Sequence, residues 1–300
     1  MADANLMATV LVCVKGDRRV LRLVESLLRQ TSPADRYEVI VVENGSSALD
    51  GIAKLDPARV RYLHTHEPNA AAARNLGLAA ARGRFLLLTD ADCVADPGRV
   101  ERLSERLASG SHGAVGGAIR KHHPQTLTQR YGITVVDGQQ SLNYLPALPR
   151  PYVVGANAGY PTALVRELGG FDEELKSGHD VDICYRLGLH GHRIGLAPDA
   201  IVFHEDRWAV GDHFRRFRHY AIYQVLLHAK YKTISGKAFV VNPYPFRRVA
   251  SALAATPRAV LHLLSGDAGP AVEAFLKLVE AAGVWSGDLV GSIRYRQLYL

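Results

Sequence analysis

Short apolar segments alternate with amphipathic segments over the first two thirds of the chain. Residues 8–14 are continuously apolar or β-branched, and residues 37–42 are nearly so. Such runs are typical of strands that are buried on both faces of a parallel sheet. Between them, residues 20–28 place leucine and valine at helical intervals, with arginine and glutamate on the other side. The pattern predicts a β-α-β unit with an amphipathic helix.

The alternation continues to about residue 206. Further strands are predicted at residues 60–63, 85–88, 113–119 and 200–204. Further helices are predicted at residues 70–81, 161–168 and 178–190, and one more is opened by Asp96 as N-cap and Pro97 at the first position. This order predicts an α/β fold with a Rossmann-like, mostly parallel sheet flanked by helices.

Two regions depart from this pattern. Residues 120–150 have little periodicity, and a loop of that length is usually functional or mobile. After residue 206 the strands cease, and helices are predicted at residues 210–231, 247–264 and 270–282, with a short helix near the end. We therefore expect a first domain over residues 1–206 and a helical C-terminal extension over residues 207–300.

Composition places the chain among ordinary globular proteins. It has 300 residues, of which 48 % are hydrophobic and 22 % are charged. These values exclude disordered, collagen-like and disulfide-rich classes. The formal charge of +7 favours phosphates or anionic surfaces. It does not indicate nucleic acid, which would require the basic residues to cluster on one face, and we expect no nucleic-acid partner.

The cysteines and the start of the chain bear on localisation. The three cysteines lie far apart in apolar runs and include no CxxC pair, which favours a reducing compartment and not a zinc site. The first residues lack the pattern of a signal peptide, and no uncharged apolar run reaches the length of about 18 residues that a spanning helix needs. We expect a cytoplasmic protein.

The strongest candidate chemistry follows the predicted strand at residues 85–88. Asp90 and Asp92 lie two residues apart beyond this strand, at the edge of the sheet where open α/β folds bind ligands. Two such carboxylates can hold Mg²⁺ or Mn²⁺ together with diphosphate oxygens. The alternative is that Asp90 only caps the turn.

Other candidates are weaker when taken singly. Glu43 follows the second strand and could bind a base edge or a ribose hydroxyl. Arg74 lies in the alanine-rich helix and could reach a diphosphate or a neighbouring carboxylate. His204 ends a strand as either a metal ligand or a core histidine. Asp180 lies in the first turn of a predicted helix and is a candidate general base.

A second acidic residue in the same helix is expected to have a structural role and not a catalytic one. Asp182 and Arg186 are spaced i, i+4, which favours an intrahelical ion pair.

Five segments, taken in order and spacing, resemble glycosyltransferase family 2 over residues 8–206. They are Glu43-Asn44-Gly45-Ser46, Ala73-Arg74-Asn75-Leu76-Gly77, Asp90-Ala91-Asp92, Gly170-Phe171-Asp172 before His179-Asp180, and Phe203-His204. The resemblance implies the GT-A fold, a nucleotide-activated sugar donor that is usually UDP-linked, and inversion of the anomeric configuration in one displacement.

The resemblance also implies roles for individual residues. Glu43 would read the nucleobase, Arg74 would hold the nucleotide, and Asp90 would contact ribose or sugar. Asp92 and His204 would ligate Mn²⁺ or Mg²⁺, and Asp180 would be the catalytic base. The end of the first strand at Val14 would contact the donor nucleotide, and Asn157 and His179 are expected near the sugar or acceptor.

Two positions depart from the family pattern. His179 stands where the family most often has glutamate, and a nearby imidazolium would favour an ionised Asp180. At the end of the first strand, residues 14–17 lack the common threonine and aromatic residue, and Lys15 is a candidate contact of the diphosphate instead.

We therefore predict an inverting, metal-dependent glycosyltransferase that uses a nucleotide-sugar donor, with a small molecule, polysaccharide or lipid-linked glycan as acceptor. A non-catalytic nucleotide-sugar-binding or scaffolding protein is the alternative. A sugar-1-phosphate nucleotidyltransferase is disfavoured, because residues 13–17 match its glycine-rich and basic loop poorly.

The C-terminal extension leaves two interpretations open. Phe214, Phe217, Ala221, Ile222 and Val225 form an apolar helical stripe beside several arginines. The stripe predicts either a helix packed on the sheet domain or on a second copy in a homodimer, or a peripheral contact with an anionic membrane surface or a lipid-linked acceptor.

Overall fold

The structure is a computed structural model of the chain, and it describes residues 6–45, 51–132, 142–206 and 209–299. The chain folds into two compact units, which we call the sheet unit (1–122, 136–143 and 150–204) and the helical unit (123–135, 144–149 and 205–300). The domain boundary expected at residues 206 and 207 remains a prediction, and Arg207 itself lies outside the described residues.

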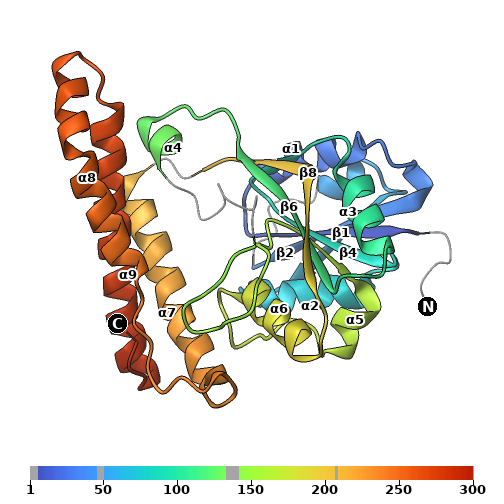
Figure 1. Cartoon of the computed structure of the whole chain (residues 1–300). Helices are drawn as coiled ribbons and strands as arrows, with labels where there is room; N and C mark the ends of the chain where they lie inside the picture. Colours follow the sequence, from blue (N-terminus) through green and yellow to red (C-terminus); the bar gives the residue numbers. More distant parts are fainter. Residues whose placement is uncertain (1–5, 46–50, 133–141, 207–208, 300) are drawn as a thin grey trace. The chain divides into compact units, whose positions relative to one another are not determined.

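The sheet unit is built on one eight-stranded sheet with the order β3-β2-β1-β4-β7-β6-β8-β5 (Figure 1). The strands are β1 (Ala8–Val14), β2 (Tyr37–Asn44), β3 (Val60–Thr65), β4 (Phe85–Asp90), β5 (Cys93–Ala95), β6 (Ala114–Lys121), β7 (Asn157–Pro161) and β8 (Ile194–His204). Strands β3, β2, β1 and β4 are mutually parallel, as are β6 and β8. Strands β7 and β5 pair antiparallel with their neighbours.

Helices of the sheet unit pack on this sheet, and small residues set how closely they approach it. They are α1 (Val20–Leu28), α2 (Ala70–Ala80), α3 (Arg99–Ala108), α5 (Thr162–Glu167) and α6 (His179–Leu189), with short 3₁₀ turns at Ala34–Arg36 and Ile52–Lys54. A Cβ atom added to Gly77 of α2 would lie 2.2 Å from Cδ1 of Leu11 in β1. The alanine-rich helix therefore lies directly against the strand that carries Val14.

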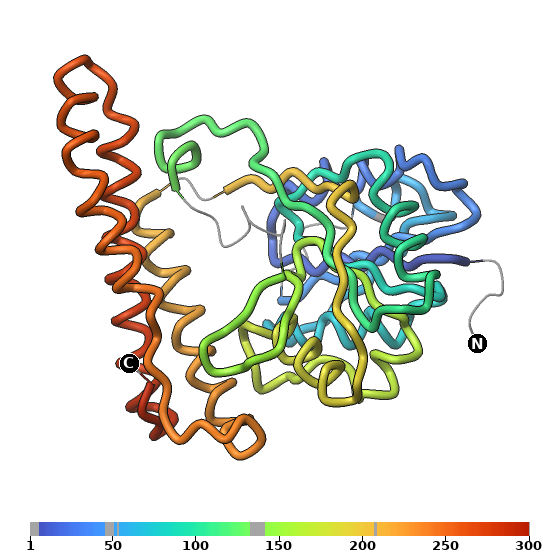
Figure 2. The backbone as a smooth tube through the Cα atoms, viewed as in Figure 1, coloured from blue at the N-terminus to red at the C-terminus, as the bar shows by residue number. Residues whose placement is uncertain are grey.

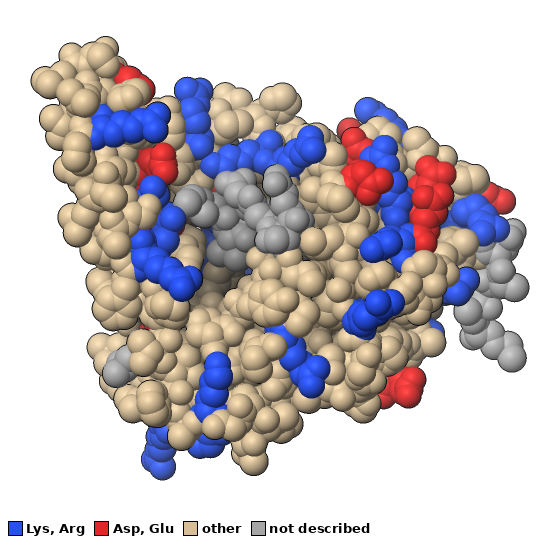
Figure 3. All heavy atoms as spheres, viewed as in Figure 1, with Lys and Arg blue, Asp and Glu red and all other residues tan. Residues whose placement is uncertain are grey.

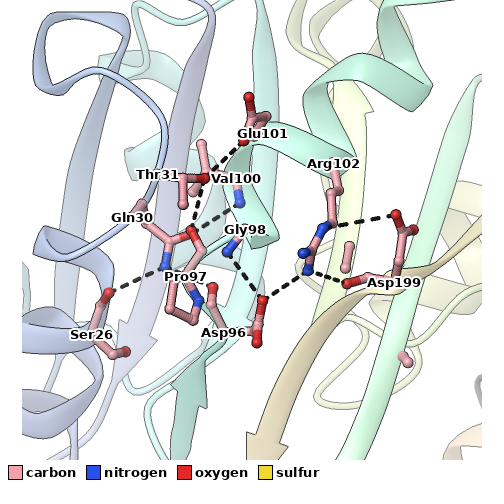
Figure 4. A network of polar contacts seen from close by, with 12 residues as sticks. Ser26, Gln30, Thr31, Asp96, Pro97, Gly98, Val100, Glu101, Arg102 and Asp199 are labelled. Atoms are coloured by element: carbon pink, nitrogen blue, oxygen red, sulfur yellow. Dashed lines mark hydrogen bonds and ion pairs between the residues drawn. The ribbon is translucent and has the colours of Figure 1, made fainter.

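The start of α3 differs from the prediction. The helix begins at Arg99 with Gly98 at the N-cap position, and not at Asp96. Figure 4 shows the reason: the Asp96 carboxylate accepts from the Gly98 amide (3.1 Å) and from Arg102 (2.8 Å). The Gln30 side chain, just beyond α1, accepts from the Val100 amide (3.0 Å). A glutamine distant in sequence thus caps the helix.

Two elements were not predicted. Strand β7 has the sequence Asn-Ala-Gly-Tyr-Pro and lies between β4 and β6 in the sheet. Glycine and proline are unfavourable in strands, so the sequence pattern did not predict it. The predicted loop at residues 120–150 contains helix α4 (Leu127–Tyr131), which a capping box of Thr126 and Gln129 begins. Residues 133–141 of that loop lie outside the described residues.

The helical unit consists chiefly of α7 (Val210–Ser235), α8 (Tyr244–Leu264) and α9 (Gly269–Tyr295), and α9 packs on both other helices (Figure 2). The predicted helix at residues 270–282 and the short helix after it are one helix. Its glycines break the sequence pattern because they meet α7 backbone: a Cβ atom on Gly287 would lie 2.4 Å from the Arg218 carbonyl oxygen.

The apolar stripe of α7 is therefore core. Phe217, Ala221 and Val225 are at most 3 % exposed and contact α9. These three residues of the stripe pack on a neighbouring helix of their own unit, and the expected contacts with a second copy or a membrane remain predictions. Among the described residues, no helix is long and apolar enough to cross a bilayer.

Candidate active site

The register of the parallel strands brings candidate residues to one edge of the sheet. Val14 is the register partner of Glu43, and Cys13 is the partner of Asp90. Because parallel strands end at the same edge, the last residues of β1, β2 and β4 lie together, as expected for the ligand-binding edge of an α/β sheet.

Glu43 and Val14 are buried at this edge of the sheet. Glu43 is fully buried, and its Oε1 atom accepts a hydrogen bond from the Gly16 amide (2.9 Å). Gly16 has a φ of 63°, the left-handed conformation that glycine adopts readily. Val14 is 3 % exposed. Glu43 thus fixes the loop after β1, where a nucleoside is expected to bind.

Asp90, Asp92 and His204 come together as a potential metal site. Strand β5 pairs antiparallel with β8 so that Cys93 is opposite His204, which places Asp92 beside the imidazole. One donor atom from each of the three residues lies within 4.8 Å of the others, and Oδ1 of Asp92 is 3.4 Å from Nε2 of His204.

The donor set fits a divalent cation. Oδ1 of Asp92 is buried and accepts no hydrogen bond from the described residues, so its negative charge lacks a donor. Two carboxylates suit Mg²⁺ or Mn²⁺, and an imidazole adds a nitrogen ligand. Burial and the neighbouring Asp92 raise the pKa of Asp90, although 46 % of its side chain still meets solvent. A bound cation would relieve this repulsion.

Two arginines place positive charge beside the carboxylates. Arg19 lies 3.7 Å from Asp92 and pairs with Asp17 at 2.6 Å. Arg74 lies 3.9 Å from Asp90. Burial works to lower the pKa of Arg74, but nearby acidic groups, Asp90 and Asp180 among them, outweigh it and raise the pKa. Arg74, with 14 % of its side chain exposed, thus remains a cation at the edge of the carboxylate cluster.

His179 is neutral, which corrects the expected imidazolium. Arg74 Nη1 lies 2.9 Å from Nδ1 of His179, and because a guanidinium only donates, Nδ1 must accept and Nε2 must carry the proton. Burial and the Arg74 charge lower the pKa of His179 to about 3. The histidine therefore positions Arg74 without neutralising its charge.

Asp180 is oriented by backbone amides. Its Oδ2 atom accepts from the Gly155 amide (2.9 Å) and its Oδ1 atom accepts from the Val181 amide (3.0 Å). It lies in the first turn of α6, near the positive end of the helix dipole. Gly155 makes room for this arrangement: a Cβ atom there would lie 3.3 Å from Nη2 of Arg74 and 3.7 Å from Oδ2 of Asp180.

The family-like segments interlock around these residues. The Asn75 side chain accepts from the Phe171 amide and donates to the Phe171 carbonyl oxygen, both at 2.8 Å, and the Arg74 guanidinium lies 5.8 Å from the centre of the Phe171 ring. The predicted pair of Asp182 and Arg186 is confirmed at 2.7 Å. Asp182 is therefore occupied by a structural ion pair. Asp180 is the carboxylate of this helical turn that lies near Arg74.

Asn157 has a structural role and not the expected place in a sugar or acceptor site. It is fully buried at the start of β7. Its Oδ1 atom accepts from Arg99 (2.9 Å), and its Nδ2 atom donates to the carbonyl oxygens of Ala118 and Ala200 (both 2.8 Å). These bonds join β6, β7 and β8 to α3, so the side chain is committed to the core.

Sequence reasoning missed two residues of the site. Arg19 lies just before the predicted helix at residues 20–28 and was given no role, although a basic residue shortly after the first strand can reach a phosphate group. Gly155 contributes its backbone amide, which no side-chain pattern reveals.

A family model described as glycosyl transferase family 2 matches residues 9–169. The chain belongs to glycosyltransferase family 2. This confirms the resemblance to the family, and the match covers the part of the chain that carries Glu43, Arg74, Asp90 and Asp92.

Curated relatives share the family over part of their length. The chain is 30 % identical over 216 residues to the pre-mycofactocin glycosyltransferase of Mycobacterium tuberculosis strain H37Rv, covering 69 % of this chain and 44 % of the relative. It is 24 % identical over 222 residues to the validoxylamine A glucosyltransferase of Streptomyces hygroscopicus subsp. limoneus, covering 62 % and 48 %. The chain spans less than half the length of these relatives.

Solved structures confirm the GT-A fold. The mannosyltransferase PcManGT from Pyrobaculum calidifontis, solved in complex with GDP-Man and Mn²⁺, aligns with a TM-score of 0.59 at 19 % identity, covering 93 % of this chain and 86 % of that one. TarS of S. aureus aligns with a TM-score of 0.50 at 20 % identity, covering 74 % and 40 %. The predicted α/β fold with C-terminal helices is confirmed.

Proposed function

We propose that this protein is an inverting glycosyltransferase that moves a sugar from a nucleoside diphosphate to an acceptor hydroxyl, with help from a divalent cation. The observation that carries the proposal is the arrangement of the strand edge. A candidate cation site lies beside Arg74, and a separate carboxylate, Asp180, is held by backbone amides next to the same arginine.

Asp92 and His204 would ligate Mn²⁺ or Mg²⁺, and Asp90 would contact the ribose or the sugar beside it. The bound cation would supply positive charge to the diphosphate leaving group. Arg74 is a largely enclosed cation held by the neutral His179, so its full charge would be available to the same phosphates. This pairing replaces the glutamate that the family most often has at the position of His179.

Asp180 would remove the proton from the acceptor hydroxyl. Two backbone amides hold its carboxylate, so it needs no reorientation when the hydroxyl arrives. A single base aligned opposite the leaving group suffices for inversion in one displacement, and no covalent nucleophile is required.

The nucleobase of the sugar donor and the acceptor complete the proposal. Glu43 and the end of β1 at Val14 would bind the nucleoside. The family resemblance favours a UDP-sugar as donor. The GDP-Man complex of PcManGT makes a guanine nucleotide the first alternative. We assign the donor site to residues 1–206, and we propose that residues 207–300 contribute contacts to the acceptor. A scaffolding role and nucleotidyl transfer are not favoured by the family match.

Asp180→Asn tests the role of the base. Because a general base contributes roughly 10²- to 10⁴-fold, we expect the variant to lose turnover by at least about 10²-fold while it binds the donor with unchanged affinity. Release of nucleoside diphosphate from a panel of sugar donors measures turnover, and calorimetric titration measures donor binding. Glu174→Gln, at an exposed position in the turn before α6, is the control. Equal turnover of Asp180→Asn and the native enzyme would contradict the proposal.

A further inference from the structure

Helices α8 and α9 present a broad apolar face to solvent. On α8, Phe246, Leu253 and Leu264 are 55, 66 and 82 % exposed. On α9, Trp285, Leu289 and Ile293 are 40, 55 and 72 % exposed. Folded chains rarely expose so many large apolar side chains together unless the surface binds something.

These side chains form one continuous face. Residues 285, 289 and 293 follow each other at intervals of one helical turn, and residues 246, 253 and 264 also recur on one side of their helix. The rings of Phe246 and Trp285 meet edge to face with centroids 5.4 Å apart, so the two stripes adjoin. The opposite sides of both helices are buried, at Ala252 and Ala259 in α8 and at Val284 in α9. We call this surface the α8–α9 face.

The charged residues of α8, which are Arg247, Arg248 and Arg258, are all basic. Between Asp212 and Asp267 the chain has nine Lys and Arg residues and no Asp or Glu. With 36 bases and 29 acids in the whole chain, this stretch supplies all of the excess positive charge. Figure 3 shows tan and blue surface over these helices with little red. Arg247 and Arg258 are exposed beside the apolar stripe of α8.

The acids of α9 are turned away from the face or paired. Glu280 is fully buried and pairs with Arg248 at 2.5 Å. Asp288 is 1 % exposed and accepts from Asn242 (3.1 Å). Glu273 pairs with Lys277 at 2.8 Å. The exposed side of the two helices thus combines large apolar side chains with basic borders.

We propose that the α8–α9 face docks on an anionic phospholipid surface. An apolar stripe with a central tryptophan and basic borders is the composition that binds at the boundary between headgroups and acyl chains, and each Lys or Arg adds attraction to anionic headgroups. A second copy fits less well, because pairing two such faces would bring basic borders together. The proposal does not depend on the proposed function.

Vesicle flotation of the full chain tests this proposal. We expect the protein to float with vesicles made of equal parts phosphatidylglycerol and phosphatidylcholine, to float weakly with pure phosphatidylcholine, and to lose binding as salt is raised. Leu253→Glu with Leu289→Glu should reduce flotation at least tenfold. Arg247→Glu with Arg258→Glu should do the same for anionic vesicles without removing an apolar side chain.

Leu189→Glu, at a leucine that is 38 % exposed in the sheet unit, is the matched control and should float like the native chain. Thermal melts verify that each variant is folded. The proposal is overturned if the native chain stays unbound with anionic vesicles, or if the double glutamate variant floats as well as the control. It is also overturned if light scattering shows a dimer of the native chain that this variant abolishes without a change in flotation.

Discussion

Asp288 should make the stability of the protein depend on pH around neutrality. It is 1 % exposed in the middle of α9, and Asn242 donates to its Oδ2 atom, while its Oδ1 atom has no hydrogen-bond partner among the described residues. Burial outweighs this one hydrogen bond and raises the pKa of Asp288 from 3.8 to about 7. The carboxyl is therefore protonated in the folded chain at a pH where the unfolded chain has released the proton.

The sign of the effect follows from proton linkage. The folded state binds one more proton than the unfolded state between the two pKa values, so stability is fully present below pH 3.8 and is lost as pH rises through about 7. Since each pKa unit is worth about 1.4 kcal/mol, the loss reaches about 4 kcal/mol in all, of which about 3 kcal/mol falls between about pH 5 and about pH 8.

Asp288→Asn removes the titration and keeps a polar side chain that can still pair with Asn242. Urea unfolding at about pH 5 and about pH 8 should show the variant gaining about 3 kcal/mol over the native chain across this interval. Asp35→Asn, at an exposed position, controls for the loss of one negative charge. A difference between variant and native chain that stays constant with pH would refute the assignment.

Three further predictions follow from the packing and from the site. Asn157→Ala should cost about 3 kcal/mol or more of unfolding free energy, because it removes the partner of the buried Arg99 Nε atom and the amide that donates to two carbonyl oxygens; a loss under about 1 kcal/mol in urea would show that water replaces the amide. Gly287→Val should destabilise the chain by about 1 to 3 kcal/mol or more by forcing α9 away from α7, whereas Ala282→Val on the exposed side of α9 should unfold at nearly the native urea concentration. His179→Gln should make the free energy of unfolding less sensitive to acid. The pKa of His179 in the folded chain, about 3, lies below the usual 6.5, so the histidine contributes stability above about pH 6.5 that is lost as pH falls. If the free energy of unfolding falls equally steeply with pH for variant and native chain below about pH 6, the reasoning is refuted.

Much of the sheet unit could be predicted because its signals are local. Buried strands such as β1 and amphipathic helices such as α1 have strong hydrophobic patterns, and the edge of a parallel sheet gathers residues that end its strands. Asp90, Asp92 and Glu43 could therefore be placed from the sequence. The ion pair of Asp182 and Arg186 also follows from helical spacing alone.

The remaining features depend on contacts between distant residues. Strand β7 could not be predicted from five residues that include glycine and proline, because its partners β4 and β6 stabilise it. The neutral state of His179 comes from burial beside Arg74, which is far away in sequence. The length of α9 could not be predicted because its glycines, which allow close packing against α7, lower the helix propensity of the sequence. Asn157 was assigned to a ligand because its buried partners could not be foreseen.

A thermal-shift panel with UDP, GDP, dTDP and CDP, each with and without Mn²⁺ or Mg²⁺, tests the central claim most directly. A ligand at about 100 times its dissociation constant stabilises the folded chain by about 2.7 kcal/mol. We predict that one nucleoside diphosphate raises the melting temperature only when the cation is present, and that Asp92→Ala abolishes this shift while the protein alone remains folded. If no nucleotide shifts the melting temperature with either cation, or if the shift is unchanged in Asp92→Ala, the assigned donor site is wrong.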